Sequence, residues 1–135
     1  FRTEEMKRVL NISEEDLTQE ISSEHNNLDR ETLCNWFKES NKFAFKFTEK
    51  YKKYKDFIKN FIKSEEIALK WAHFIGNEDF MIEKIEDPTI ATKWALFNGD
   101  KDRMEEIVSE SGDQDSIMYW NLSHPDRRIE RDSKN

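Results

Sequence analysis

The sequence predicts an all-α fold, a compact stack of short helical hairpin repeats with about six to eight helices. Glycine and proline are scarce, at three and two among 135 residues, whereas folds rich in β-structure need them at their turns. Large apolar residues recur at spacings of three and four, and a stretch of the chain repeats after 23 residues. Although 38% of the residues are charged and only 36% are hydrophobic, this regular spacing argues against disorder.

A chain of this length suits one domain with a single hydrophobic core. Aromatic side chains make up 13% of the residues, so a few large rings can supply much of the buried surface. We therefore expect one helical domain over residues 1–135. It would consist of N-terminal helices in 1–41, helical repeats in 42–122 and a polar tail in 123–135, which is expected to fray.

The N-terminal region predicts three helices. The first covers residues 2–10, and Ser13 is the N-cap of the second because three acidic residues follow it, where the helix dipole favours them. Residues 22–27 are expected to form a loop. Asp29 then caps the third helix, which we expect to end at residues 40–41.

Residues 42–63 carry the most regular pattern in the chain. Seven apolar or aromatic side chains follow helical spacing and predict one continuous amphipathic helix, with lysines on its other faces. These residues are Phe43, Phe47, Tyr51, Tyr54, Ile58, Phe61 and Ile62.

From residue 64 onward, capping and turn residues mark two helical hairpins and one further helix. The stop signals after the first helix of each hairpin are Gly76-Asn77 and Asn98-Gly99. Asp87 followed by Pro88 is typical of a helix start. The expected helices begin after Ser64, at about Asp79, after Asp87, after Asp100 and at about Ser116.

The internal repeat aligns residues 68–85 with 91–108. Seven positions match in order: Ala68, Trp71, Ala72, Phe74, Gly76, Met81 and Ile85 correspond to Ala91, Trp94, Ala95, Phe97, Gly99, Met104 and Val108. A weaker match at an offset of 24 extends backward. It aligns Ala44, Phe47, Phe57, Ile58 and Phe61 with Ala68, Trp71, Met81, Ile82 and Ile85. Because this earlier unit lacks the central glycine, its two helices are predicted to be fused. Because neither hairpin can bury its apolar face alone, successive units are expected to stack, with Trp71 and Trp94 in equivalent positions between them.

The segment EDPTIATKWALFNGDKDRMEEIVSE resembles the leucine-rich-repeat-variant type of helical repeat, which is similar in style to HEAT repeats. The residues that carry the resemblance are Asp87, Pro88, Ala95, Asn98, Ile107 and Val108. Trp71 and Trp94 depart from it, because an aliphatic residue is usual at that position. The resemblance covers residues 64–110. It implies a scaffold of stacked helices that binds protein or nucleic acid, and it carries over no catalytic residue.

Charge is distributed unevenly along the chain. Residues 42–63 contain 8 lysines and 2 acidic residues, whereas residues 64–116 contain 14 acidic and 5 basic residues. The net charge of the whole chain is −7. This separation favours polar binding surfaces, although solvated faces and helix capping also account for many of these charges.

These observations favour a non-catalytic protein–protein interaction module, such as a small acidic inhibitor, immunity protein or adaptor. The residues expected to bind a partner are Lys52, Lys55, Lys59, Lys63, Glu78, Asp79, Asp100, Asp102, Trp36 and Trp120. Another protein is the expected partner. The alternatives are nucleic-acid binding through the lysine-rich helix 42–63, and mimicry of nucleic acid by the acidic segment 64–116.

The sequence contains no pattern that identifies an enzyme, a cofactor site or a metal site. Cys34 is the only cysteine, and the three histidines, His25, His73 and His124, have no zinc-binding spacing. We interpret Cys34 as a structural thiol. A single cysteine fits a reducing, cytoplasmic compartment, and without a run of about 18 apolar residues we expect no membrane partner.

Overall fold

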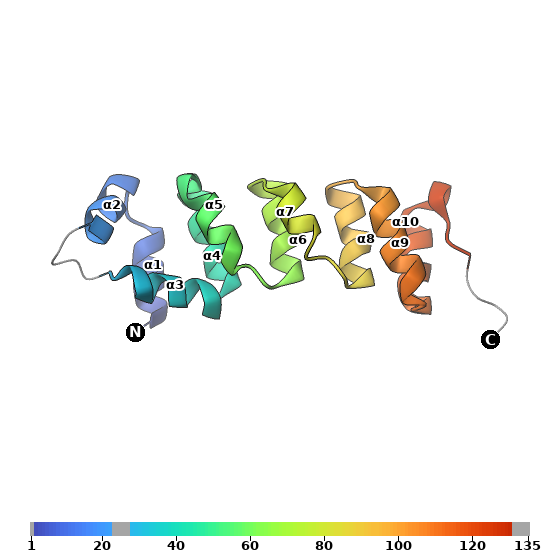
Figure 1. Ribbon diagram of the computed structural model, residues 1–135, viewed down its shortest axis with the longest axis horizontal. Coiled ribbons are helices and arrows are strands. Elements are labelled where there is room, and N and C mark those ends of the chain that lie inside the picture. Colours follow the sequence, from blue (N-terminus) through green and yellow to red (C-terminus); the bar gives the residue numbers. More distant parts are fainter. Residues whose placement is uncertain (1, 23–27, 131–135) are drawn as a thin grey trace. The chain divides into compact units, whose positions relative to one another are not determined.

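The computed structural model describes residues 2–22 and 28–130, and the secondary structure of these residues is entirely helical (Figure 1). The described residues form ten α-helices and three short 3-10 helices, so the fold class is confirmed and the helix count exceeds the predicted six to eight. The α-helices are α1 (Arg2–Leu10), α2 (Glu14–Ser22), α3 (Arg30–Glu39), α4 (Asn41–Lys50), α5 (Lys55–Ile58), α6 (Glu65–Phe74), α7 (Glu78–Ile82), α8 (Pro88–Phe97), α9 (Lys101–Ser111) and α10 (Gln114–Ser123). The 3-10 helices are η1 (Lys52–Tyr54), η2 (Lys59–Phe61) and η3 (Pro125–Arg127).

The chain divides into two compact units, which we call unit 1, up to Ile67, and unit 2, from Ala68 onward. The loop expected at residues 22–27 lies outside the described residues, except that Ser22 ends α2.

A helix of ten residues is the recurring element of both units. Among the described residues it occurs five times, as α3, α4, α6, α8 and α10. A serine or aspartate precedes each copy, and in four of them its side chain accepts a hydrogen bond from the first turn. The fourth and seventh residues are buried in every copy, as a helical apolar stripe requires. These pairs are Leu33 and Trp36, Ala44 and Phe47, Ala68 and Trp71, Ala91 and Trp94, and Ile117 and Trp120.

In unit 1, the predicted continuous helix over 42–63 is wrong. Helix α4 ends at Lys50, and Tyr51 leaves the helical conformation with φ −115° and ψ 68°. The Tyr51 ring is buried, and its hydroxyl lies 2.7 Å from the carbonyl oxygen of Val9 and 2.6 Å from that of Ile12. Helical periodicity could not reveal this break, because burial of Tyr51 and its long-range hydrogen bond favour the turn.

Aromatic rings fill the core of unit 1. The Phe37 ring lies 5.1 Å from Phe47 and 5.8 Å from both Phe43 and Phe61, and Phe47 lies 4.8 Å from Tyr51, measured between ring centroids. These stacked, edge-on and tilted contacts join α3, α4 and η2.

Asn41 closes unit 1 by joining the start of α4 to the segment after η2. Its amide nitrogen donates to the carbonyl oxygens of Phe37 and Phe61, at 3.0 Å each. Its side-chain oxygen accepts from the backbone N–H groups of Lys63 and Ser64, at 2.7 and 2.8 Å. A single side chain therefore satisfies four backbone groups at a helix junction.

In unit 2, Trp71 and Trp94 occupy equivalent positions, as the repeat predicts. Both side chains are fully buried. The Trp71 indole donates to Asn77 at 3.0 Å, and the Trp94 indole donates to Asp100 at 2.9 Å. Asn77 and Asp100 both have left-handed backbone conformations, with φ of 57° and 55°. The repeat therefore includes the turn residue that satisfies each buried indole.

The second helix of the first hairpin, α5, is shifted by one residue relative to the weaker sequence alignment at an offset of 24. Phe57, which the offset of 24 aligned with Met81, is 56% exposed, whereas Ile58 is buried like Met81 and Met104. Ile58 thus precedes Met81 by 23 residues, because the turn between α4 and α5 is one residue longer. The first and second helices of the hairpin consequently repeat at different offsets.

The segment that follows α10 is ordered as far as Glu130, whereas the sequence predicted that it would fray. The Trp120 indole donates to the carbonyl oxygen of Arg127 at 2.8 Å. Asn121 exchanges two hydrogen bonds with the backbone of Ile129, at 2.9 and 2.6 Å. These contacts hold residues 123–130, so the predicted tail is ordered over that range; residues 131–135 lie outside the described part.

Candidate interaction surface

The C-terminal ends of α6, α8 and α10 present large apolar side chains to solvent. The ninth and tenth residues of these helices are His73 and Phe74, Leu96 and Phe97, and Leu122 and Ser123. We call His73, Phe74, Leu96, Phe97 and Leu122 the apolar edge of unit 2. The exposed fractions are 58% for Phe74, 48% for Leu96, 56% for Phe97 and 75% for Leu122.

Aromatic contacts join this edge across two helices. The His73 ring lies 4.6 Å from the Phe74 ring and 5.7 Å from the Phe97 ring, between centroids. The Asn98 amide also donates to the carbonyl oxygen of Leu69, at 3.4 Å. Helices α8 and α10 pack together and run in the same direction, so their C-terminal ends lie on one side of unit 2 (Figure 1). Exposed apolar residues grouped in this way are unusual on a surface that only solvent covers.

The outer face of α10 extends the apolar edge. The fifth residue of α8, Thr92, is fully buried, whereas the fifth residue of α10, Met118, is 44% exposed. Leu122 lies one helical turn beyond Met118 on the same face, and Tyr119 is 38% exposed. Among the described residues, α10 therefore lacks the neighbour that covers the corresponding face of α8.

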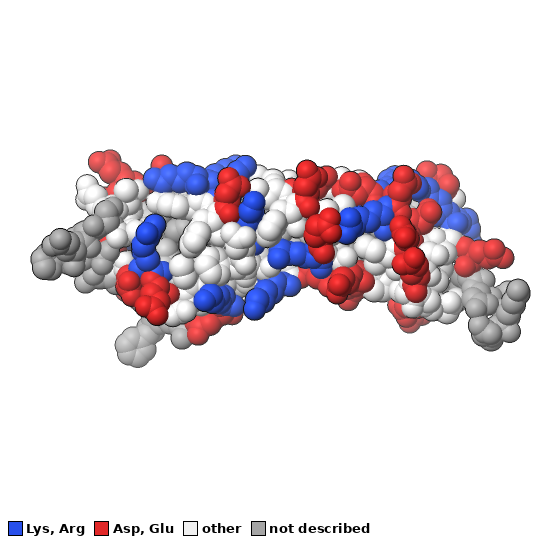
Figure 2. Space-filling view, in the orientation of Figure 1, with Lys and Arg blue, Asp and Glu red and all other residues white. Residues whose placement is uncertain are grey.

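Acidic side chains lie at the turns beside the apolar edge. Glu78 and Asp79 begin α7 after the turn that follows α6, and Asp100 and Asp102 lie at the start of α9 after the turn that follows α8. On the face that Figure 2 displays, acidic side chains over α6–α9 are interrupted by basic ones. The structure thus brings these four predicted residues of unit 2 to the same end of their hairpins.

These four carboxylates differ in their surroundings. Asp102 forms an ion pair with Arg127, which also bonds Glu105 at 3.2 Å. Burial, together with the neighbouring Asp100 carboxylate, raises the pKa of Glu78. Asp100 also accepts the indole hydrogen bond of Trp94. Asp100 therefore has a structural role, in addition to any role in binding.

The predicted lysines of unit 1 do not lie on one helix, because the chain breaks at Tyr51. Lys52 and Lys63 are exposed, whereas Lys55 and Lys59 are half-buried. Lys59 lies 3.9 Å from the Asp56 carboxylate. These four side chains come from η1, α5, η2 and the following loop, so the periodic lysine face expected for phosphate tracking is not formed. Nucleic-acid binding through them stays a prediction.

The two tryptophans expected at an interface lie in the core instead. Trp36 is 8% exposed and Trp120 is fully buried. The seventh position of the ten-residue helix explains both, because that position faces inward in every copy. The exposed side chains that sequence reasoning missed occupy the ninth and tenth positions, where the internal repeat aligns Phe74 with Phe97.

Within residues 2–22 and 28–130, no three side chains of His, Cys, Asp or Glu are arranged to hold a metal ion. His73 belongs to the apolar edge, and His124 is buried and stacked 4.0 Å from Trp120. Burial raises the pKa of the Cys34 thiol. His25 lies outside the described residues.

None of the helices that the structure describes combines the length and apolar character needed to cross a lipid bilayer. Comparison of the chain with protein-family models, with curated proteins and with solved structures finds no match. The resemblance to leucine-rich-repeat-variant repeats therefore stays a prediction from the sequence.

Proposed function

We propose that this chain is a non-catalytic protein–protein interaction module whose recognition surface is the apolar edge of unit 2. The observation that carries the proposal is the exposure of Phe74, Phe97 and Leu122 at matching ends of three helices. Interface centres are rich in aromatic and large aliphatic side chains that a partner removes from water.

The charge beside the edge defines the kind of partner. Asp79 and Asp102 flank the apolar residues, and unit 2 carries the strongly acidic segment of the chain. A complementary partner would present an apolar face bordered by lysine or arginine. An inhibitor or adaptor that occupies a basic partner would work in this way.

The experiment compares capture of a partner by the full chain and by matched surface variants. Phe97→Asp and Leu122→Asp place a charge in the proposed interface. Phe57→Asp is the control, because Phe57 has the same 56% exposure as Phe97 but belongs to unit 1. Proteins retained by the wild type and the control but lost by both edge variants would be identified by mass spectrometry and then purified.

Binding of the purified partner would be measured by calorimetry. We expect each edge variant to weaken binding at least tenfold, as truncation at an interface hot spot does, and Phe57→Asp to leave the dissociation constant within twofold. Edge variants that capture every protein retained by the wild type would refute the proposed surface. Circular dichroism would verify that every variant is folded.

A further inference from the structure

Unit 1 contains a cavity of about 480 Å³ that the interaction surface of unit 2 does not use. Its walls come from the end of α2 and from α3, α4, η1 and α5. The apolar walls include Leu33, Phe37, Phe47 and Ile58, whose side chains are at most 6% exposed. Cavities of this size with an apolar lining and few polar groups are typical of sites for small molecules.

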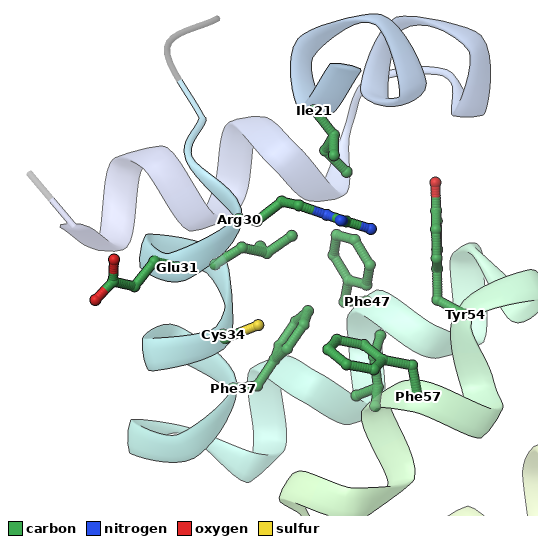
Figure 3. Close-up of a pocket in the computed structure, with 10 residues that line it drawn as sticks. Ile21, Arg30, Glu31, Cys34, Phe37, Phe47, Tyr54 and Phe57 are labelled. Carbon is green, nitrogen blue, oxygen red and sulfur yellow. The ribbon is translucent and has the colours of Figure 1, made fainter. Parts of the chain in front are cut away.

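The polar groups of the cavity are concentrated on Arg30 and Tyr54. Figure 3 shows the Arg30 side chain reaching across the cavity toward Tyr54, with Phe47 beneath it. The Glu31 carboxylate points the other way. Arg30 therefore places a cationic group over an apolar space, while the nearest carboxylate on its own helix faces outward.

Among the described residues, Arg30 differs from three other arginines in having no carboxylate partner. Arg8 pairs with Glu20, Arg103 with Glu83, and Arg127 with Asp102 and Glu105. Within the described residues, the Arg30 guanidinium forms no ion pair or hydrogen bond, and the Tyr54 hydroxyl forms no hydrogen bond. A guanidinium pairs with a carboxylate through two parallel hydrogen bonds, so an anionic group fits this position.

The remaining lining restricts the charge of the ligand. Cys34 borders the cavity, and burial raises the pKa of its thiol, so this side chain is neutral near pH 7. Arg30 is the only cationic side chain among the described residues that line the cavity. One cation balances one negative charge, so the site favours a monoanion over a phosphate group.

We propose that the cavity of unit 1 binds a small amphipathic monocarboxylate, with its apolar body among the aromatic rings and its carboxylate on Arg30. A volume of 480 Å³ equals that of about 16 water molecules in the liquid, which accommodates a medium-length alkyl chain. Transfer of that chain from water supplies affinity, and Arg30 together with the Tyr54 hydroxyl supplies selectivity for the carboxylate.

The test uses three probes with the same ten-carbon chain: decanoate, decanol and decyltrimethylammonium. Calorimetry with the full chain should show decanoate binding at least tenfold more tightly than decanol, and the cation binding most weakly. Arg30→Gln should weaken decanoate binding about tenfold while decanol binding changes less than twofold, because hydrogen bonds to charged groups are the stronger ones. Arg30→Lys should recover part of the loss.

Cys34 gives an independent readout, because it is the only cysteine in the chain. Saturating decanoate should slow the reaction of Cys34 with a thiol-specific disulfide reagent at least fivefold in the wild type. Ile58→Trp, which fills the cavity, should abolish decanoate binding, and circular dichroism would establish that it is folded. Phe97→Asp should keep full decanoate binding, which separates this site from the surface of unit 2.

Results of three kinds would overturn the proposal. The first is no decanoate binding by the folded wild type at millimolar concentration. The second is equal binding of decanoate and decanol, or equal decanoate binding by the wild type and Arg30→Gln. The third is binding that leaves the reaction rate of Cys34 unchanged, because the ligand would then lie elsewhere.

Discussion

The two units of the molecule use the same ten-residue helix but pack it with side chains of different size. In unit 1 the eighth residue of α3 is Phe37, which contacts three other rings. In unit 2 the eighth residue of α8 is Ala95, and Ala91 fills the fourth position. Alanine permits close approach of neighbouring helices, whereas large rings meet at fixed angles and leave space between them.

The two units also differ in the feature on which each proposal rests. Aromatic rings of unit 1 line a cavity that is partly open to solvent. Unit 2 instead exposes Phe74, Phe97 and Leu122. We therefore relate the two proposals to side-chain size at a few positions of the same local pattern.

The strongest test of this comparison removes, in each unit, the side chain at the seventh position of a ten-residue helix. Trp94→Ala and Phe47→Ala should each lower the free energy of unfolding by about 3–5 kcal/mol, because both side chains are almost fully buried. Chemical denaturation would measure the loss, and hydrogen exchange with mass spectrometry would locate it in unit 2 or unit 1 respectively. A loss below about 1 kcal/mol for either variant would show that the seventh positions are not equivalent.

A second test concerns the junction that Asn41 forms in unit 1 between the start of α4 and the segment after η2. Asn41→Leu should lower the free energy of unfolding by about 2 kcal/mol, because four backbone hydrogen bonds are lost. Asn60→Leu is the matched control: its amide bonds only the nearby carbonyls of Asp56 and Phe57 at the surface. Thermal or denaturant unfolding of both variants would decide, and equal losses would contradict the role of Asn41.

A third test distinguishes hydrogen bonding from charge at the turn of unit 2. Asp100→Ala should lower the free energy of unfolding by about 1–2 kcal/mol, because the buried Trp94 indole loses its acceptor. Asp100→Asn should be neutral or stabilising, since Asn77 performs the same role for Trp71 and the repulsion with Glu78 would disappear. Denaturant unfolding measures both. The interpretation fails if Asn and Ala destabilise equally.

The smallest expected effect is a pH dependence in unit 2. Burial lowers the pKa of His124 below its usual 6.5, and its Nε2 atom is buried without a partner. Folding therefore disfavours the protonated ring. The contribution of the neutral His124 ring to the free energy of unfolding is complete above pH 6.5 and is lost progressively as the pH falls below that value. Unfolding measured between pH 7.5 and 5.5 should show this decline in the wild type and a weaker one in His124→Phe.

Glu78 gives a pH dependence of stability with the opposite sign, at lower pH than that of His124. Because its pKa is raised in the folded state, ionisation of this carboxyl group destabilises the fold at neutral pH, and the penalty is relieved as the pH falls toward 4.5. Glu78→Gln should therefore stabilise the protein at pH 7 and remove that relief. A loss of stability at pH 7 in this variant would contradict the cause assigned to the shift.

The sequence by itself determined most of the helices outside residues 42–63, because helix formation depends on neighbours three and four residues apart and on local caps. The matching of Trp71 with Trp94 and the turn residues Gly76-Asn77 and Gly99-Asp100 were readable for that reason. Only the tertiary structure decided that Tyr51 breaks the helix, since its hydroxyl bonds to backbone some 40 residues away. It also decided that Trp36 is buried while Phe97 is exposed, and that Arg30 lies over a cavity. Periodicity finds an apolar stripe, but which side chains of that stripe meet another element depends on contacts between segments distant in the chain.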